Sequence, residues 1–164
     1  ATSMGVIGGG LHMVTHAVGK ITLFMCAGSI YVAAQKTEIS QMTGLGRCMP
    51  VTFISFLIGS LSIIGLPPLA GSWSKWLLIV ASADAEQIAM MVVLLISSLL
   101  NVAYLLPLVA KGFFLSKYDD KTPTKFAEGP FLLWLPPALT AFGCIILFFY
   151  AGYIQEFLMP LIAN

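Results

Sequence analysis

An apolar stretch from residue 49 to about residue 83 is interrupted near its middle, and this interruption constrains the fold more than any other feature. The stretch exceeds the ~20 residues that a helix needs to cross a bilayer. Pro67 and Pro68 each remove a backbone donor and clash with the preceding helical turn, and the flanking Gly65 and Gly71 relax the backbone further. A break at membrane depth is tolerated only where it packs against protein or lines a water-filled cavity. We therefore predict one discontinuous helix, broken at Pro67–Gly71.

The remaining sequence also consists of long apolar segments separated by short polar loops. Hydrophobic residues make up 59% of the 164 residues and charged residues only 9%, whereas soluble domains carry roughly 25% charged residues. This pattern indicates an integral membrane protein. We predict an all-α, polytopic transmembrane helix bundle that forms a single domain over residues 1–164. Its membrane segments are predicted at about 4–34, 50–82, 88–110 and 130–154.

The basic residues outside the apolar segments all fall in two loops, residues 35–49 and 111–129. With four crossings, these loops lie on the same side of the membrane. Because cytoplasmic loops are enriched in lysine and arginine, we expect both loops to be cytoplasmic and both chain ends to lie on the opposite side. The basic residues concerned are Lys36, Arg47, Lys111, Lys117, Lys121 and Lys125.

Two lysines, Lys20 and Lys75, fall inside apolar segments, where a charge costs from ~2.5 to more than 10 kcal/mol. His12 and His16 precede Lys20 at intervals of four residues. On a helix these three side chains drift by only ~80° around the axis over ~12 Å. They therefore form one titratable stripe. The nearby hydroxyl groups that could bind water belong to Thr15, Thr22 and Ser74.

Such a stripe is suited to proton transfer. Histidine titrates near neutral pH, and desolvation disfavours the charged form of an amine, so a buried lysine can exchange protons. We expect Lys20 and Lys75 to carry protons, with His16 and His12 linking them or opening a half-channel. The alternative for the histidines is an ordinary hydrogen-bonded role in the core. The alternative for Lys75 is a side chain that extends along the half-helix toward the interface.

Other chemistries fit these residues less well. His12 and His16 have the spacing of a zinc protease motif, but Met13 stands where the catalytic glutamate is needed. Both histidines share one helical face and cannot clamp one haem. The glycines of residues 8–10 match no phosphate-binding loop, and no basic patch with aromatic residues suggests nucleic acid. We predict no metal site, no cofactor and no nucleic-acid partner, and a redox subunit that itself binds quinone lacks support.

Three motifs in order along the chain resemble one family of membrane subunits. That family comprises the antiporter-like subunits of respiratory complex I, of Mrp-type multisubunit sodium/proton antiporters and of membrane-bound hydrogenases. The motifs lie between residue 12 and about residue 76. They read His12-x3-His16-Ala17-x2-Lys20-x2-Leu23-Phe24-x2-Ala27-Gly28, then Gly44-Leu45-Gly46-Arg47-x-Met49-Pro50, then Gly65-Leu66-Pro67-Pro68-x-Ala70-Gly71-x-Trp73-Ser74-Lys75.

The resemblance implies a long subunit built from two inverted repeats, each with one interrupted helix. This chain would be its C-terminal part. Lys75 would correspond to the lysine of the second interrupted helix, the terminal site facing the outer half-channel, and His12, His16 and Lys20 to the central polar axis. The ending at residues 73–76 looks closer to the D-type members of Mrp antiporters or to hydrogenase-type members than to complex I members with glutamate there. Ser72 departs from the family, where phenylalanine is common.

The function expected from this resemblance is translocation of protons, or exchange of another cation such as sodium against protons, within a multisubunit complex. The alternative is a scaffolding subunit of a respiratory NADH-quinone oxidoreductase or hydrogenase complex, with buried lysines in structural roles. We do not expect the chain to transport ions or catalyse a reaction alone, because the family's first repeat, with its glutamate–lysine pair, is not among these residues. Its expected partners are other integral membrane subunits and lipid, in a bacterial or archaeal inner membrane.

Overall fold

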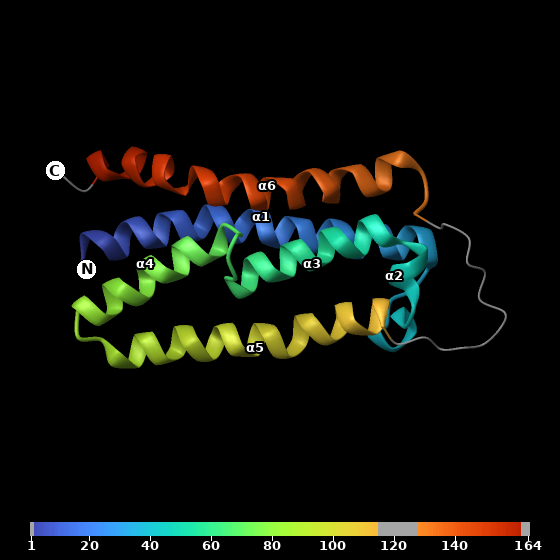
Figure 1. The fold of residues 1–164 in the computed structure, drawn as a ribbon, viewed down its shortest axis with the longest axis horizontal. Helices are drawn as coiled ribbons and strands as arrows, with labels where there is room; N and C mark the ends of the chain where they lie inside the picture. Colours follow the sequence, from blue (N-terminus) through green and yellow to red (C-terminus); the bar gives the residue numbers. More distant parts are fainter. Residues whose placement is uncertain (1, 115–127, 162–164) are drawn as a thin grey trace.

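The structure, a computed structural model, describes residues 2–114 and 128–161 as a bundle of helices, and these residues contain no strand. The predicted all-α class is therefore confirmed. Figure 1 shows α1 and α6 side by side, with the interrupted pair α3 and α4 between α1 and α5. The helices are α1 (Ser3–Ala34), α2 (Leu45–Cys48), α3 (Pro50–Ile64), α4 (Gly71–Asp84), α5 (Ile88–Phe113) and α6 (Phe131–Leu158), with short 3₁₀ turns η1 (Ile39–Met42) and η2 (Met159–Leu161).

Three helices in the described part of the chain, α1, α5 and α6, are long and apolar enough to cross a membrane. The shorter apolar helix α3 covers only part of that length, and α4 continues toward the opposite end of the bundle (Figure 1). Together α3 and α4 occupy the place of one broken crossing. The helix limits lie within a few residues of the predicted segments. Residues 39–42 and 45–48, expected to be loop, form η1 and α2.

The break between α3 and α4 covers residues 65–70, slightly earlier than predicted. Gly65 ends α3 because it adopts φ +92°, a conformation that favours glycine. Gly71 already belongs to α4, and a Cβ atom there would overlap the carbonyl oxygen of Ser62. The backbone N–H of Ala70 donates to the carbonyl of Cys144 on α6 at 3.2 Å. The break is thus packed against a neighbouring helix, as a break at membrane depth requires.

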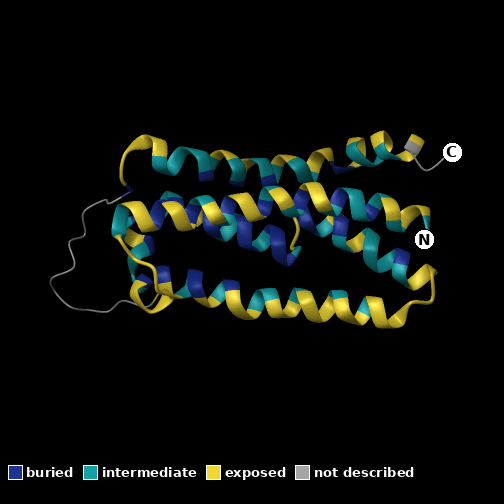
Figure 2. Cartoon of the chain, turned by 180° about the vertical axis from the view of Figure 1, so that it is seen from behind, coloured by how far each residue is buried: buried dark blue, intermediate teal, exposed yellow. Residues whose placement is uncertain are grey.

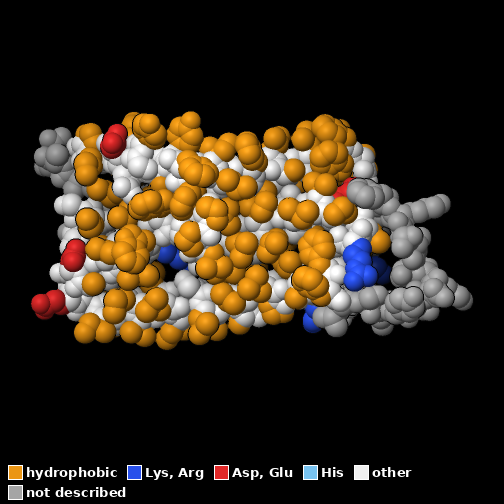
Figure 3. All heavy atoms as spheres, viewed as in Figure 1, with side chains coloured by type: hydrophobic (Ala, Val, Ile, Leu, Met, Phe, Trp, Pro, Cys, Tyr) orange, Lys and Arg blue, Asp and Glu red, His pale blue; other side chains and the backbone are white. Residues whose placement is uncertain are grey.

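The core of the bundle lies where α1, α3 and the end of α5 meet. Phe53 of α3 is fully buried there. Its ring packs so closely on Gly112 of α5 that a Cβ atom on that glycine would overlap the ring. The outer face of α5, in contrast, is almost wholly exposed and apolar (Figure 2). On the face drawn in Figure 3, apolar side chains cover most of the surface between the two ends of the bundle. Such a surface is suited to lipid or to other membrane helices.

The described charged side chains differ between the two ends of the bundle: one end is acidic, and the other holds basic residues together with Glu38 and Glu128. Asp84 and Glu86 lie at the turn between α4 and α5, near the end where both termini lie (Figures 1 and 3). Basic side chains gather at the opposite end, around α2 and the end of α5 (Figure 3). The basic residues there include Lys36, Arg47 and Lys111, whereas Lys117, Lys121 and Lys125 lie outside the described residues.

Candidate functional site

Lys75 lies in the second turn of α4 and reaches back across the break. Its ammonium group donates to the carbonyl oxygen of Ile64 at 3.0 Å and to the hydroxyl of Ser98 at 2.7 Å. Ile64 is the last residue of α3, whose C-terminus carries partial negative charge. Ser98 lies on α5. The lysine therefore joins three helical segments at one point and compensates the unpaired carbonyl end of α3.

The Lys75 side chain lines an open groove of about 690 Å³ between the break, α4 and α5. Figure 3 shows basic atoms in a hollow of this otherwise apolar face. The walls are mostly aromatic and aliphatic, and the polar groups near the lysine come from Ser98 and from the backbone of the break. A cation in an apolar recess with few polar partners is a common arrangement at ion pathways in membrane proteins. The other principal lining residues are Leu66, Pro67, Trp73, Trp76 and Phe148.

Ser74, the residue before Lys75, points toward α1 and organises a separate hydrogen-bonded group. It is fully buried. Its hydroxyl lies 3.0 Å from Nδ1 of His12 and 3.2 Å from the hydroxyl of Thr15, and it also reaches the Gly71 carbonyl at 3.2 Å. Consecutive residues on a helix are about 100° apart. Two consecutive residues of α4 therefore make polar contacts with different helices, Ser74 with α1 and Lys75 with α5.

Among the described residues, His16 contacts this group through the ring of His12. Their ring centroids are 5.3 Å apart with a tilt of 35°. The structure thus brings together four of the predicted site residues from two helices, namely His12, His16, Thr15 and Ser74, with Lys75 adjacent to Ser74 along α4.

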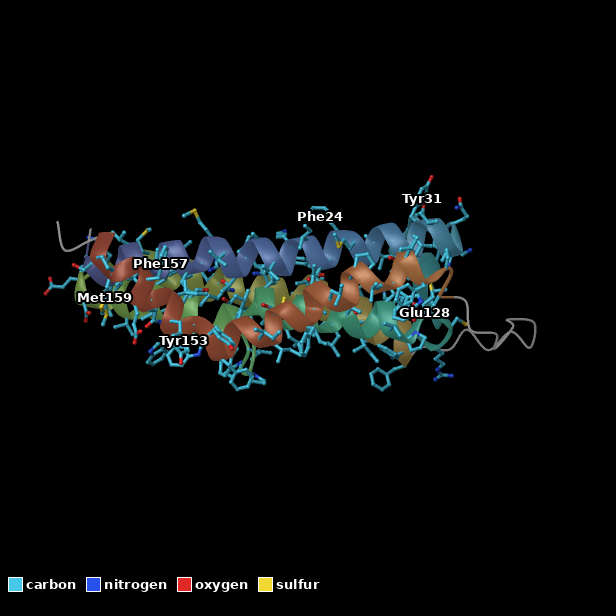
Figure 4. All side chains as sticks on the ribbon, turned by 90° about the horizontal axis from the view of Figure 1, so that it is seen from above. Phe24, Tyr31, Glu128, Tyr153, Phe157 and Met159 are labelled. Carbon is cyan, nitrogen blue, oxygen red and sulfur yellow. The ribbon has the colours of Figure 1, made fainter. Side chains whose placement is uncertain are left out.

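Lys20 lies apart from this group, on the open face of α1. It is exposed, and within residues 2–114 and 128–161 it makes no hydrogen bond or ion pair. Phe24, one helical turn later on the same face, points away from the bundle, as does Tyr31 (Figure 4). The drift of ~80° from His12 to Lys20 is enough to move the lysine out of the helix interface. In this structure Lys20 is therefore not joined to the histidines by a direct contact.

Thr22, expected to bind water, is fully buried and already has partners in the protein. Its hydroxyl donates to the carbonyl of Val18 at 2.8 Å and lies 4.0 Å from the Cys144 sulfur. Across the described residues, no group of three or more His, Cys, Asp or Glu side chains is arranged to hold a metal ion.

Two residues with notable contacts, Ser98 and Glu128, are not among the predicted site residues. Ser98 is one of several hydroxyl residues in its segment, and nothing local distinguishes it from Ser97. Glu128 falls near the end of the predicted loop 111–129, yet its buried carboxylate accepts hydrogen bonds from the backbone of Val51 and from the backbone and side chain of Thr52. Glu128 and Thr52 are 76 residues apart. No sequence spacing could have revealed this contact.

Comparison with known proteins gave one matching family and several relatives. Residues 1–101 match the family described as "NADH:quinone oxidoreductase/Mrp antiporter, TM". The chain is 33% identical over 110 residues to NADH-quinone oxidoreductase subunit N of Desulforudis audaxviator, covering 67% of this chain and 22% of that protein. It is 32% identical over 151 residues to NADH-quinone oxidoreductase subunit L of Rickettsia bellii, a match that covers 92% of this chain and 23% of that protein. The chain therefore spans less than a quarter of the length of these curated relatives.

One solved structure has the same fold. A chain from the structure of the Mrp complex from Dietzia sp. DQ12-45-1b superposes with a TM-score of 0.82 at 22% sequence identity. The match covers 93% of this chain and 36% of that one. At this level of identity the similarity concerns the fold.

Proposed function

Because the chain belongs to the NADH:quinone oxidoreductase/Mrp antiporter transmembrane family, we propose that it forms part of a membrane subunit that translocates protons, or exchanges another cation for protons. The observation that carries this proposal is the Lys75 ammonium. It lies in a groove at a helix break, held by the Ile64 carbonyl and the Ser98 hydroxyl. Discontinuous helices with a charged group at the break are typical of ion-transport sites.

In this proposal Lys75 takes up and releases the transported proton. The Ile64 carbonyl and Ser98 favour the ammonium form, while the apolar groove walls favour the neutral amine. Because these opposing influences act on one side chain, a small change in the hydration of the groove shifts the balance. The lysine can then load on one side and unload on the other.

The histidine group supplies protons toward the break. The Ser74 hydroxyl can donate and accept at once, so His12, Thr15 and Ser74 form a chain along which a proton can move. His16 extends this chain along α1. We propose that Lys20 joins it when the open face of α1 is covered by the parts of the subunit that these residues do not include, with water bridging the gap.

The assembly and orientation follow from the same reasoning. Relatives of this chain are named as subunits of NADH-quinone oxidoreductase, and its fold neighbour comes from an Mrp complex. We propose that this chain likewise works among other integral membrane subunits, in the inner membrane of a bacterial or archaeal cell. The end with Lys36, Arg47 and Lys111 faces the cytoplasm.

A scaffolding role is the second candidate, and the contacts of Lys75 themselves favour it. An ammonium that caps α3 and binds Ser98 of α5 would also hold the broken crossing together. This hypothesis predicts that loss of the lysine damages assembly, whereas the transport hypothesis predicts that it damages ion movement in an assembled complex.

The deciding experiment compares the wild type with Lys75→Ala in membrane vesicles that bear the intact complex. A pH-sensitive dye reports the gradient, and native gels report complex abundance. Lys36→Ala, which removes an exposed lysine at the basic end, is the matched control. A fall in the dye signal at unchanged abundance supports the transport role. An unchanged signal at matched abundance refutes it, and loss of the complex supports the scaffold. Repeating the measurement with and without sodium distinguishes proton transport from cation exchange.

A further inference from the structure

The half-helix α3 carries charged side chains of opposite sign at its two ends. At its N-terminus the carboxylate of Glu128 accepts from the N–H groups of Val51 at 2.5 Å and Thr52 at 3.3 Å, and from the Thr52 hydroxyl at 2.7 Å. At its C-terminus the ammonium of Lys75 donates to the Ile64 carbonyl at 3.0 Å. Neither charged residue belongs to α3.

This arrangement compensates the dipole of α3 at both ends. The N-terminus of a helix carries partial positive charge and its C-terminus partial negative charge. Glu128 supplies the cap that α3 otherwise lacks, because its N-cap residue, Met49, makes no side-chain hydrogen bond. Glu128 is only 6% exposed, and Thr52 is fully buried. Charges in such surroundings are weakly screened, so their interaction with the dipole is stronger than at a water-exposed helix end.

The buried surroundings of α3 extend along most of its length. Its 15 residues span ~22 Å. The helix packs against α1, α5 and α6, and the Ser60 hydroxyl is buried without a hydrogen-bond partner among the described residues. Glu128 is buried and Lys75 is half-buried, so the effective dielectric constant between them is well below that of water and the carboxylate contributes to the potential at the other end of α3.

We propose that Glu128 is a positioning residue for proton exchange at Lys75. It holds the first turn of α3 and strengthens the negative potential of the carbonyl end that receives the ammonium. The proposal rests on the proposed function, since it assumes that Lys75 carries the transported proton. Its consequence is that Glu128, in the loop before α6, tunes proton binding at Lys75 from the opposite end of α3, ~22 Å away, without touching the lysine.

The test compares Glu128→Gln with Glu128→Asp in the intact complex, with transport measured by the pH-gradient dye and normalised to complex abundance. Glutamine keeps the length and an acceptor oxygen but removes the charge, whereas aspartate keeps the charge on a shorter side chain. The charge-based role predicts a roughly two- to fivefold fall in the transport rate for glutamine, the size expected for a charge acting over the length of α3 at an intermediate dielectric constant, and a smaller fall for aspartate. A glutamine variant that transports as well as or better than the aspartate variant overturns the proposal. Glu156→Gln, exposed on α6, is the matched control and should transport normally.

A second measurement does not depend on transport. The apparent melting temperature of the purified complex is compared for Glu128→Gln, Lys75→Met and the double variant. Distant sites without shared partners have additive effects. If the two residues are coupled through α3, Glu128→Gln lowers the melting temperature less when Lys75 is already replaced. If the two single effects simply add up in the double variant, the proposed coupling is overturned. If Glu128→Gln fails to assemble, Thr52→Val, which removes one donor to the carboxylate, replaces it in this comparison of single and double variants. Additive effects on the melting temperature would again overturn the coupling.

These experiments separate the two proposals. If Lys75→Ala leaves transport intact, the proposed function fails, and the melting-temperature cycle still decides whether Glu128 and Lys75 are coupled. If Lys75→Ala abolishes transport while Glu128→Gln is without effect, only the role of Glu128 fails.

Discussion

Lys75 donates a hydrogen bond to the carbonyl oxygen of Ile64, so the first charged residue beyond the helix break binds the last residue before it. The break and the charge are therefore one structural unit. The loop between α3 and α4 leaves carbonyl groups without helical partners, and the ammonium satisfies one of them while remaining in the groove. Any movement of α4 relative to α3 changes the contacts of the ammonium. This gives a physical route by which rearrangement of the break alters proton binding.

Ser98→Ala should reduce transport by roughly tenfold, because a hydrogen bond to a charged group contributes ~1.5–3 kcal/mol. The Ser98 hydroxyl is the side-chain acceptor for the Lys75 ammonium, and alanine leaves the ammonium with less stabilisation in the groove. Initial transport rates in vesicles at matched complex abundance provide the measurement.

The control for this change is Ser97→Ala, which removes the neighbouring hydroxyl on the exposed side of α5. Ser98→Thr keeps a hydroxyl and should restore most of the rate. Equal losses at positions 97 and 98 would show that the contact with Lys75 is not the cause.

Ser74→Ala and His12→Ala should have strongly non-additive effects on transport and on stability. Both changes break the same 3.0 Å contact between α1 and α4, so the double variant should lose less than the sum of the single losses. The expected coupling is ~0.5–1.5 kcal/mol, the usual net value of one hydrogen bond. Thermal unfolding of the purified complex for the wild type, both single variants and the double variant measures it. Independent effects would mean that this hydrogen bond contributes nothing.

Gly71→Ala should destabilise the protein, since a Cβ atom at this position overlaps the carbonyl oxygen of Ser62. Overpacking typically costs ~1–3 kcal/mol, which outweighs the gain of up to ~1 kcal/mol from placing alanine in a helix. The melting temperature of the complex should fall, and transport should fall with it because the break must open to relieve the overlap.

Gly152→Ala on α6 is the matched substitution, because beyond its own helical backbone no described atom lies within 4 Å of the position of its new Cβ. It should leave the melting temperature unchanged or slightly raised. A melting temperature for Gly71→Ala equal to that of Gly152→Ala would contradict the close approach of α4 to α3.

The orientation can be tested by labelling single introduced cysteines with a membrane-impermeant maleimide, in a background from which Cys26, Cys48 and Cys144 have been removed. Glu86→Cys lies at the acidic end, between α4 and α5, and should react in intact cells. Lys36→Cys lies at the basic end and should react only after permeabilisation. The reverse pattern would show that the basic end faces outward.

The sequence alone determined the fold class, the approximate helix limits and the place of the break. Hydrophobicity along a segment and the loss of a backbone donor at proline are local properties. They do not depend on which helix packs against which. For the same reason the position of Lys75 beside the break was readable from the chain, as was the spacing of His12, His16 and Lys20.

Only the tertiary structure decided which of these side chains meet. The contacts of Ser74 with His12, of Lys75 with Ser98 and of Glu128 with Thr52 join residues 62, 23 and 76 positions apart. Such pairs depend on how each helix is rotated and how far it slides against its neighbours, and many side chains far apart in the sequence determine this through packing. The same rotation leaves Lys20 on the open face of α1, although its spacing relative to His16 is regular. Spacing along a helix assigns a residue to a face, and packing determines what that face touches.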